Sequence, residues 1–143
     1  MIVLGIDPGT AITGYGLVSD SDGETAAIAY GAITTASVGG TTSTMAALMP
    51  VTGAISTATV PAALEALRVA KEAAPGVTGL MGGPHPTFLY EEVLTDESGG
   101  VDYVLRGEAE VTLPELMGVL AAGGDPASVR GVAFMRSGAV VAT

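Results

Sequence analysis

Residues 1–18 read MIVLGIDPGTAITGYGLV, two apolar runs separated by a glycine-rich turn. Ile2–Ile6 is rich in β-branched residues and ends at Asp-Pro-Gly, which predicts a strand followed by a turn. Gly14–Ser19 predicts a second strand, and Thr25–Thr34 predicts a third strand after a tight turn at 20–23. The first part of the chain is therefore predicted to be an antiparallel β-meander.

The composition changes after this meander. A stretch that is low in charge and rich in Gly, Ser and Thr marks an internal seam near residues 36–53. At the end of this seam, Val51–Ile55 predicts a short buried strand. Residues 56–59 predict a polar loop after it. Ala63–Ala74 contains good helix formers, and we expect Pro61 in the first turn of that helix.

The rest of the sequence alternates between strand and helix patterns. The predicted strands are Val77–Met81, Val101–Leu105, Val129–Met135 and Ala139–Ala142, and the predicted helices are Phe88–Leu94 and Thr112–Ala122. Such alternation is typical of parallel sheets covered by helices. We therefore predict an α/β fold, a Rossmann-like mostly parallel sheet with an N-terminal antiparallel β-meander, in a single domain over residues 1–143.

The charge of the chain limits its partners. Lys and Arg total 5 against 15 Asp and Glu, which gives a net charge of -10, and the first basic residue is Arg68. Nucleic-acid binding needs clustered positive charge, so a nucleic-acid partner is disfavoured. The absence of cysteine excludes disulfides, thiolate zinc sites and cysteine-held iron–sulfur clusters within these residues. No pattern typical of a signal peptide or a membrane span occurs, and we expect a cytoplasmic protein.

The motif GIDPGTAITGYG and the following hairpin, over residues 1–35, resemble the start of RuvC-type Holliday-junction resolvases of the RNase H-like fold. In that family the acid at the position of Asp7 helps to bind two divalent metal ions, so the resemblance implies a Mg²⁺-dependent nuclease. Such a site needs several converging carboxylates. No acid occurs between Glu24 and Glu65, and the family's later strand-end glutamate finds no match here. The alternative is that Asp7 is only a residue of a strand-to-turn connection.

A second set of motifs lies beyond the seam. GGPHPT at 82–87, DYVLRGEAE at 102–110 and TLPEL at 112–116 follow one another in order. Over residues 54–142 this set resembles the cobalamin (B12)-binding domain found in B12-dependent radical SAM proteins. The family's first strand and helix are missing, and the resolvase-like meander stands in their place. The chain is thus chimera-like, with a RuvC-like part at 1–35 and a B12-binding-like βαβ region at 54–143.

The second resemblance implies a cobalamin site at the loops that follow the strands. In open α/β sheets a ligand lies beyond the carboxyl ends of the strands, and glycines there let the backbone approach it. The implied cofactor-binding residues are Ser56, Thr57, Gly82, Gly83, Pro84, His85, Gly107 and Glu108.

Several of these side chains have a second interpretation. His85 is either a cobalt ligand or a loop histidine hydrogen-bonded between two prolines, and the DxHxxG motif of other B12 proteins is absent. Glu108 and Glu110 either contact the ligand or form the solvated first turn of a helix, where acids are favoured. Phe88, Tyr103 and Leu116 either contact the cofactor or lie in the core, and we expect them in the core.

Three hypotheses about function follow. The first is a cobalamin-binding module that is not catalytic by itself, with a separate radical SAM catalytic domain as its partner and no contact with membranes. The second is a RuvC-like, metal-dependent nuclease centred on Asp7. The third is a chimeric or artificial folded protein with no activity.

Overall fold

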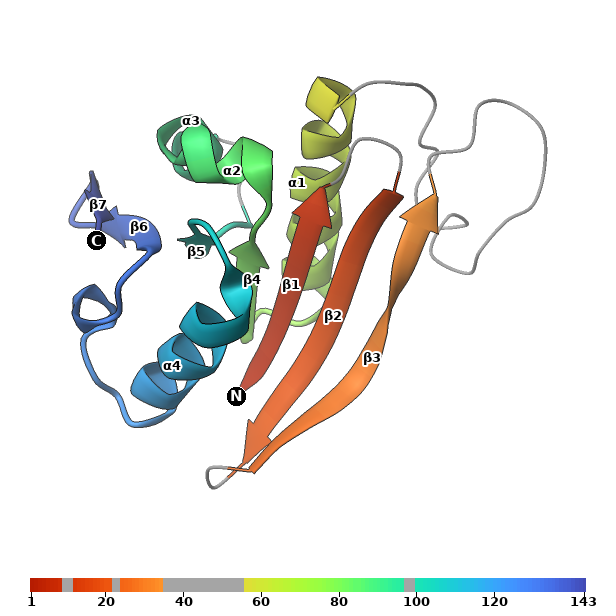
Figure 1. The fold of residues 1–143 in the computed structure, drawn as a ribbon. Helices are drawn as coiled ribbons and strands as arrows, with labels where there is room; N and C mark the ends of the chain where they lie inside the picture. The colour runs from red at the N-terminus through yellow and green to blue at the C-terminus, as the bar shows by residue number, and fades with distance from the viewer. Residues whose placement is uncertain (9–11, 22–23, 35–55, 97–99) are drawn as a thin grey trace.

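The structure, a computed structural model, describes all residues except 9–11, 22–23, 35–55 and 97–99 (Figure 1). The strands are β1 (Ile2–Pro8), β2 (Ile12–Ser21), β3 (Glu24–Thr34), β4 (Val77–Met81), β5 (Tyr103–Leu105), β6 (Val132–Arg136) and β7 (Ala139–Ala142). The helices are α1 (Ser56–Ala73), α2 (Pro84–Phe88), α3 (Tyr90–Thr95), α4 (Ala109–Ala121) and the short 3-10 helix η1 (Pro126–Ser128). None of the described helices is long and apolar enough to cross a membrane.

All the described strands form one seven-stranded sheet in the order β3-β2-β1-β4-β5-β6-β7. The middle of the sheet is parallel, because β4 pairs in parallel with both β1 and β5. The strands β1, β2 and β3 form the antiparallel meander, and β5, β6 and β7 are also paired antiparallel. The predicted α/β fold with an N-terminal antiparallel meander is confirmed.

Strands from both sequence segments share this sheet. The parallel register of β1 and β4 runs from Ile2 opposite Val77 to Ile6 opposite Met81. The resolvase-like meander therefore lies directly beside the first strand of the B12-binding-like motifs. It fills the place in the sheet where that resemblance lacks a strand.

Two layers of apolar side chains cover the two faces of the sheet. On one face Leu4 and Ile6 pack with Leu67 of α1, and on the other Val3 packs with Leu116 of α4. Successive residues of a strand point to opposite faces, so β1 supplies both layers. Figure 1 shows α1 and α4 on opposite faces, with α2 and α3 near the end of the sheet toward which β1 points.

Two helices begin earlier than the sequence predicts. The helix α1 includes residues 56–59, which were predicted to be a loop, and carries Pro61 in its interior. The helix α4 begins at Ala109, before the predicted start at Thr112, and carries Pro114 in its interior. A proline has no backbone N–H, so it removes only one hydrogen bond of the helix. Close to the start of a helix this loss can be tolerated, and one more helical turn can precede the proline.

Several other boundaries differ as well. The predicted helix Phe88–Leu94 is two short helices, α2 and α3, and the predicted loop at 84–87 belongs to α2. The strand predicted at Val101–Leu105 is shorter, and the strand predicted at Val129–Met135 is β6, which begins at Val132, after η1, and ends at Arg136. The predictions Val77–Met81 and Ala139–Ala142 are confirmed. The predicted strand Val51–Ile55 and most of the seam lie outside the described residues.

The predicted core holds in part. Leu116 is fully buried, and Tyr103 packs against the same apolar layer, with its ring centroid 5.8 Å from that of Phe134. The prediction for Phe88 is wrong, because this side chain is 80% exposed. Phe88 ends the five-residue helix α2, and in so short a helix Pro86 supplies the buried contact.

Candidate functional site

The carboxyl ends of the parallel strands β1, β4 and β5 border one cavity of about 380 Å³. It is lined by Asp7, Gly82, Gly83, Pro84, Thr87, Gly107, Glu108, Ala109 and Glu110. Crevices at this edge of an open α/β sheet are the usual place for a ligand. Five residues predicted from the second resemblance therefore meet in one cavity, and Asp7 from the first resemblance meets them there.

The loop after β4 brings its backbone close to Asp7. Gly82 donates its N–H to the carbonyl of Ile6 at 2.9 Å, which extends the pairing of β1 and β4 to their ends. Gly83 has φ 96° and ψ 176°, a conformation that is essentially restricted to glycine. A Cβ at Gly83 would lie 2.1 Å from Oδ1 of Asp7, so the carboxylate occupies the space that the missing side chain leaves.

Thr87 joins the two loops that form the cavity. Its hydroxyl donates to the carbonyl of Gly83 at 2.7 Å and accepts the N–H of Gly107 at 3.1 Å. Gly107 itself has φ 86°, and nothing lies within 4 Å of the place where its Cβ would be. The sequence contains Thr87 inside the GGPHPT motif, but no local pattern shows that it links this loop to the next one.

The cavity is acidic. Asp7, Glu108 and Glu110 are the titratable residues that line it, and the two glutamates and Asp7 are all exposed. None of the five basic residues of the chain lines it. Within the described part of the chain, no group of three or more His, Cys, Asp and Glu residues is placed to hold a metal ion.

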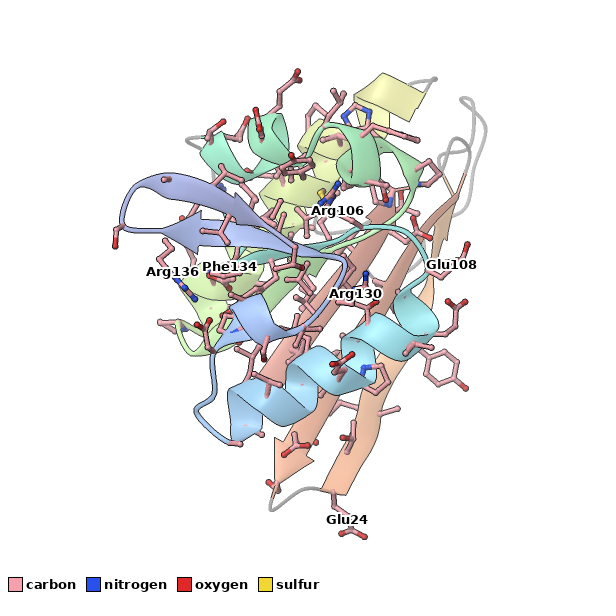
Figure 2. The ribbon with its side chains drawn as sticks, turned by 60° about the vertical axis from the view of Figure 1, so that its left-hand side comes forward. Glu24, Arg106, Glu108, Arg130, Phe134 and Arg136 are labelled. Atoms are coloured by element: carbon pink, nitrogen blue, oxygen red, sulfur yellow. The ribbon has the colours of Figure 1, made fainter. Side chains whose placement is uncertain are left out.

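Four of the five basic side chains, those of Arg68, Lys71, Arg106 and Arg136, make contacts elsewhere in the fold. The guanidinium of Arg106 lies 4.5 Å from the ring centroid of Tyr90 in α3, and Nη1 donates to the carbonyl of Thr143 at 3.3 Å. Figure 2 shows Arg106 near the centre of the view and Glu108 at the start of α4. Arg136 lies over the ring of Phe134, 5.0 Å from its centroid.

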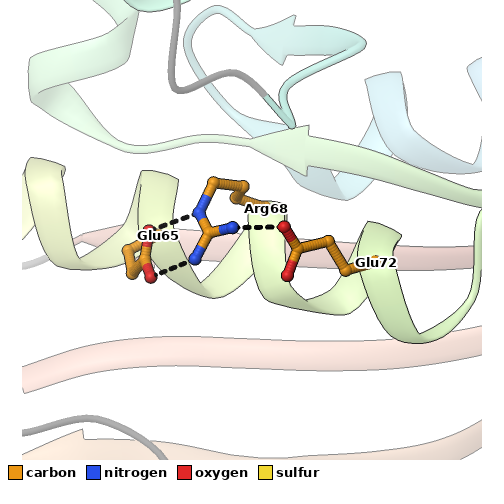
Figure 3. Close-up of polar contacts among 3 residues, drawn as sticks. All are labelled: Glu65, Arg68 and Glu72. Carbon is orange, nitrogen blue, oxygen red and sulfur yellow. Dashed lines mark hydrogen bonds and ion pairs between the residues drawn. The ribbon is translucent and has the colours of Figure 1, made fainter.

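Glu65, the first acid after Glu24, is part of a salt-bridge cluster on α1. Arg68 donates to Glu65 through Nε at 2.6 Å and Nη2 at 2.5 Å, and it also pairs with Glu72 (Figure 3). The hydrogen bonds from Arg68 hold the pKa of Glu65 below its ordinary value. Glu65 is therefore an ion-pair partner on the helix and does not join Asp7 in the cavity.

A second, apolar cavity of about 230 Å³ adjoins the first, and Asp7, Gly82 and Ala109 line both. It lies against the face of the sheet that α4 covers. The rest of its lining is glycine or apolar apart from Tyr15, namely Val3, Gly5, Ile6, Gly14, Tyr15, Gly16, Val18, Leu80, Leu105 and Leu113. Glycines of β1 and β2 leave this part of the sheet without side chains, which creates the space.

The other predicted site residues are placed differently. His85 is the second residue of α2, not a loop residue, and it does not line the cavity. Ser56 and Thr57 begin α1, and their side chains lie outside the described structure. Glu108 immediately precedes α4 and makes no side-chain cap hydrogen bond, so it is free to face either solvent or a ligand.

Asp102 of the second motif set has a structural contact that the sequence does not reveal. Its Oδ2 accepts the N–H of Gly79 at 2.8 Å, and Oδ1 accepts a hydrogen bond from Nζ of Lys71 at 2.6 Å. In return the N–H of Asp102 donates to the carbonyl of Gly79 at 2.9 Å. Asp102 therefore fixes the start of β5 to β4 and to the end of α1.

Comparison with protein families gives two matches. The B12 binding domain model matches residues 45–117, and the model of crossover junction endodeoxyribonuclease RuvC matches residues 3–75. The matched ranges overlap across the seam and α1.

The curated relatives fall into the same two groups. RuvC of Dictyoglomus thermophilum is 62% identical over 37 residues, which are 26% of this chain and 23% of that protein. The anaerobic magnesium-protoporphyrin IX monomethyl ester cyclase of Rubrivivax gelatinosus is 37% identical over 94 residues, covering 61% of this chain and 17% of the cyclase. An uncharacterized methyltransferase of Pyrococcus horikoshii is 38% identical over 87 residues, covering 59% of this chain and 19% of the methyltransferase. The chain thus spans less than a quarter of the length of each relative.

Among solved structures, the PPX-GPPA enzyme of Aquifex aeolicus matches 57% of this chain and 26% of its own chain. The identity is 15% and the TM-score 0.31, a likeness too low to carry an argument.

Proposed function

The chain belongs to the B12-binding domain family over residues 45–117 and to the RuvC family over residues 3–75, and on that premise we propose that it is a cobalamin-binding module with no catalytic activity of its own. The observation that carries the proposal is the cavity at the carboxyl ends of β1, β4 and β5. Gly82, Gly83, Pro84, Gly107 and Glu108, all from the B12-binding segment or its motifs, come together there.

The chemistry of this lining fits a corrinoid. The backbone of Gly107 is exposed and nothing lies within 4 Å of the place of its Cβ, so a flat ring or its side chains can approach there without meeting a side chain. The carboxylates of Glu108 and Glu110 are acceptors for the amide side chains at a corrin edge. A corrin is larger than a cavity of about 380 Å³, so this cavity would take one edge or the nucleotide tail, with the ring lying over the loops. When bound, cobalamin supplies methyl-transfer and radical chemistry, which the protein would only position.

A separate radical SAM catalytic domain is the partner that we propose. The relatives in the B12-binding group are much longer proteins, and this chain spans only 17% of the Rubrivivax cyclase. The 143 residues contain no cysteine to hold a cluster, so that chemistry would come from another domain or chain.

The second candidate is a metal-dependent nuclease. It is favoured by Asp7 at the end of β1, the position of the metal-binding acid in the RuvC motif, and by the two glutamates across the same cavity. Against it stands Gly82, which directly follows β4 beside the end of β1 and carries no carboxylate. Cleavage of branched DNA that requires Mg²⁺ or Mn²⁺ and is lost in Asp7→Asn would establish this candidate.

The test of the proposed function is a titration of the purified protein with hydroxocobalamin, followed by calorimetry and by the absorbance of the cobalt chromophore, with gel filtration of the mixture. We expect saturable micromolar or tighter binding and co-elution of the red cofactor with the protein. A well-folded protein that neither binds nor co-elutes would overturn the proposal and favour a folded chain without activity.

A pair of glycine variants locates the binding site. Gly82 lines both cavities, and Gly82→Leu would fill the space between them, so we expect at least about tenfold weaker binding. Gly118 lies exposed on α4 and lines neither cavity, and nothing lies within 4 Å of the place of its Cβ. Gly118→Leu is therefore the matched control, and equal loss in both variants would place the cofactor elsewhere.

A further inference from the structure

Asp7 belongs to the RuvC-like strand, but its side chain lines the cavity formed by the B12-binding motifs. Its neighbours are glycines on both sides. A Cβ at Gly83 would meet the carboxylate, and a Cβ at Gly14, opposite Asp7 on β2, would lie 3.9 Å from Cβ of Asp7. These missing side chains give the carboxylate access to the cavity.

The carboxylate has free acceptor capacity. Among the described residues, none donates a hydrogen bond to the side chain of Asp7 and none forms an ion pair with it. A carboxylate has two oxygens and about four lone-pair positions for hydrogen-bond donors. A ligand that enters the cavity would therefore meet an acceptor at Asp7 that the fold has left open.

The sign of the charge restricts which ligand edge can approach. Asp7 lies with Glu108 and Glu110 around one cavity whose lining includes no basic side chain. A second carboxylate brought close to a first is repelled by it. An uncharged amide instead donates a charge-assisted hydrogen bond.

We propose, on the basis of the cobalamin-binding function proposed above, that Asp7 is a specificity-determining residue of the cofactor cavity. Its carboxylate accepts a hydrogen bond from an amide side chain at the edge of the corrinoid and repels tetrapyrroles whose edge bears carboxylates. The acid of the RuvC motif thereby acts as a ligand selector in the joined sheet.

The experiment compares two corrinoids without a nucleotide tail. Diaquacobinamide carries amides at the ring edge, and cobyrinic acid carries carboxylates at the same positions. Binding of each is measured by calorimetry and cobalt absorbance for the wild type and the isosteric variant Asp7→Asn. Glu115→Gln is the control, because Glu115 is an exposed acid of α4 that does not line the cavity and its removal changes the net charge equally.

We expect the wild type to bind diaquacobinamide at least about tenfold more tightly than cobyrinic acid. This is the effect expected when one carboxylate of the ligand is repelled by Asp7 in a partly exposed site. Asp7→Asn should reduce this preference at least about fivefold, mainly by improving the binding of cobyrinic acid. Glu115→Gln should leave the preference within about twofold, because distant exposed charges are screened.

The outcomes separate the two proposals. If the wild type binds diaquacobinamide and Asp7→Asn has the same preference as the wild type, the role of Asp7 is overturned and the cobalamin-binding function stands. If Asp7→Asn and Glu115→Gln reduce the preference equally, the effect is one of net charge and the role of Asp7 is likewise overturned. If the wild type binds hydroxocobalamin but neither corrinoid without a tail, the role of Asp7 is overturned and the cobalamin-binding function stands. If it binds none of the three, both proposals fall. A thermal melt of each variant shows whether it is folded.

Discussion

The contact between Gly83 and Asp7 allows a worked prediction for Gly83→Ala. An alanine at φ 96° and ψ 176° is strained by about 1–3 kcal/mol, because this region is open essentially to glycine alone. The new Cβ would also lie 2.1 Å from Oδ1 of Asp7, so the carboxylate must leave its rotamer at a cost of about 0.5–1.5 kcal/mol. We expect Gly83→Ala to lower the free energy of unfolding by about 2–4 kcal/mol, a large part of the stability of a small domain.

The assay is urea unfolding followed by circular dichroism, with the midpoint and the slope both fitted. We expect a lower midpoint at an unchanged slope, since the variant exposes no more surface on unfolding. In the Asp7→Ala background the new Cβ no longer meets a carboxylate, so that cost disappears, whereas the strain of the backbone at residue 83 remains. Gly83→Ala should therefore cost about 1 kcal/mol less there than in the wild type.

Gly82→Ala is the matched control for this cycle. Its Cβ would lie 4.0 Å from Cβ of Leu105, an ordinary contact, and Gly82 has no positive φ. We expect a loss below about 1 kcal/mol, the usual size for a substitution without strain. The reasoning is refuted if Gly83→Ala costs no more than Gly82→Ala, and its steric part is refuted if the cost is equal with and without the carboxylate of Asp7.

Three further predictions concern other links in the fold. Thr87→Val should weaken hydroxocobalamin binding by about tenfold in a calorimetric titration, because the two loops of the cavity lose the hydroxyl that joins them. Asp102→Ala should lower the free energy of unfolding in urea by about 1–3 kcal/mol, because the buried N–H of Gly79 loses its acceptor. The pKa of Asp125 is lowered by its hydrogen bond from Arg136, so this carboxylate stabilises the fold above its ordinary pKa of 3.8, and the contribution is lost as the pH falls below that value. Asp125→Asn should therefore show a shallower loss of thermal stability on acidification than the wild type, and parallel profiles would contradict the prediction.

The fold class could be predicted because its signals are local. Val77–Met81 and Ala139–Ala142 were predicted at their observed bounds, since turn residues flank a short apolar run in both cases. The starts of α1 and α4 could not be predicted. Pro61 indicates the first turn of a helix, but α1 begins at Ser56, and α4 begins at Ala109, three residues before the predicted start at Thr112. Composition does not show how far a helix extends before a proline.

The glycines of the candidate site could be predicted from the sequence, but the contacts between its loops could not. Gly82, Gly83 and Gly107 stand after strands, a position that sequence shows directly. Asp7 and Thr87 join them through contacts between segments far apart in the chain, and no local pattern encodes such contacts. The exposure of Phe88 is missed for a similar reason, because hydrophobicity alone does not say which side of a five-residue helix is covered.

The alternation of side chains along β1 explains how one strand can contribute to both the core and the cavity. Leu4 and Ile6 point toward α1, whereas Val3 and Asp7 point toward the face that α4 covers. Because side chains alternate along a strand, a slip of one residue against β4 would bury Asp7 under α1 and remove Ile6 from the core. Burial of an unpaired carboxylate and loss of apolar packing both oppose that slip. The same hydrophobic pattern that fixes the join between the two segments therefore fixes Asp7 at the cavity.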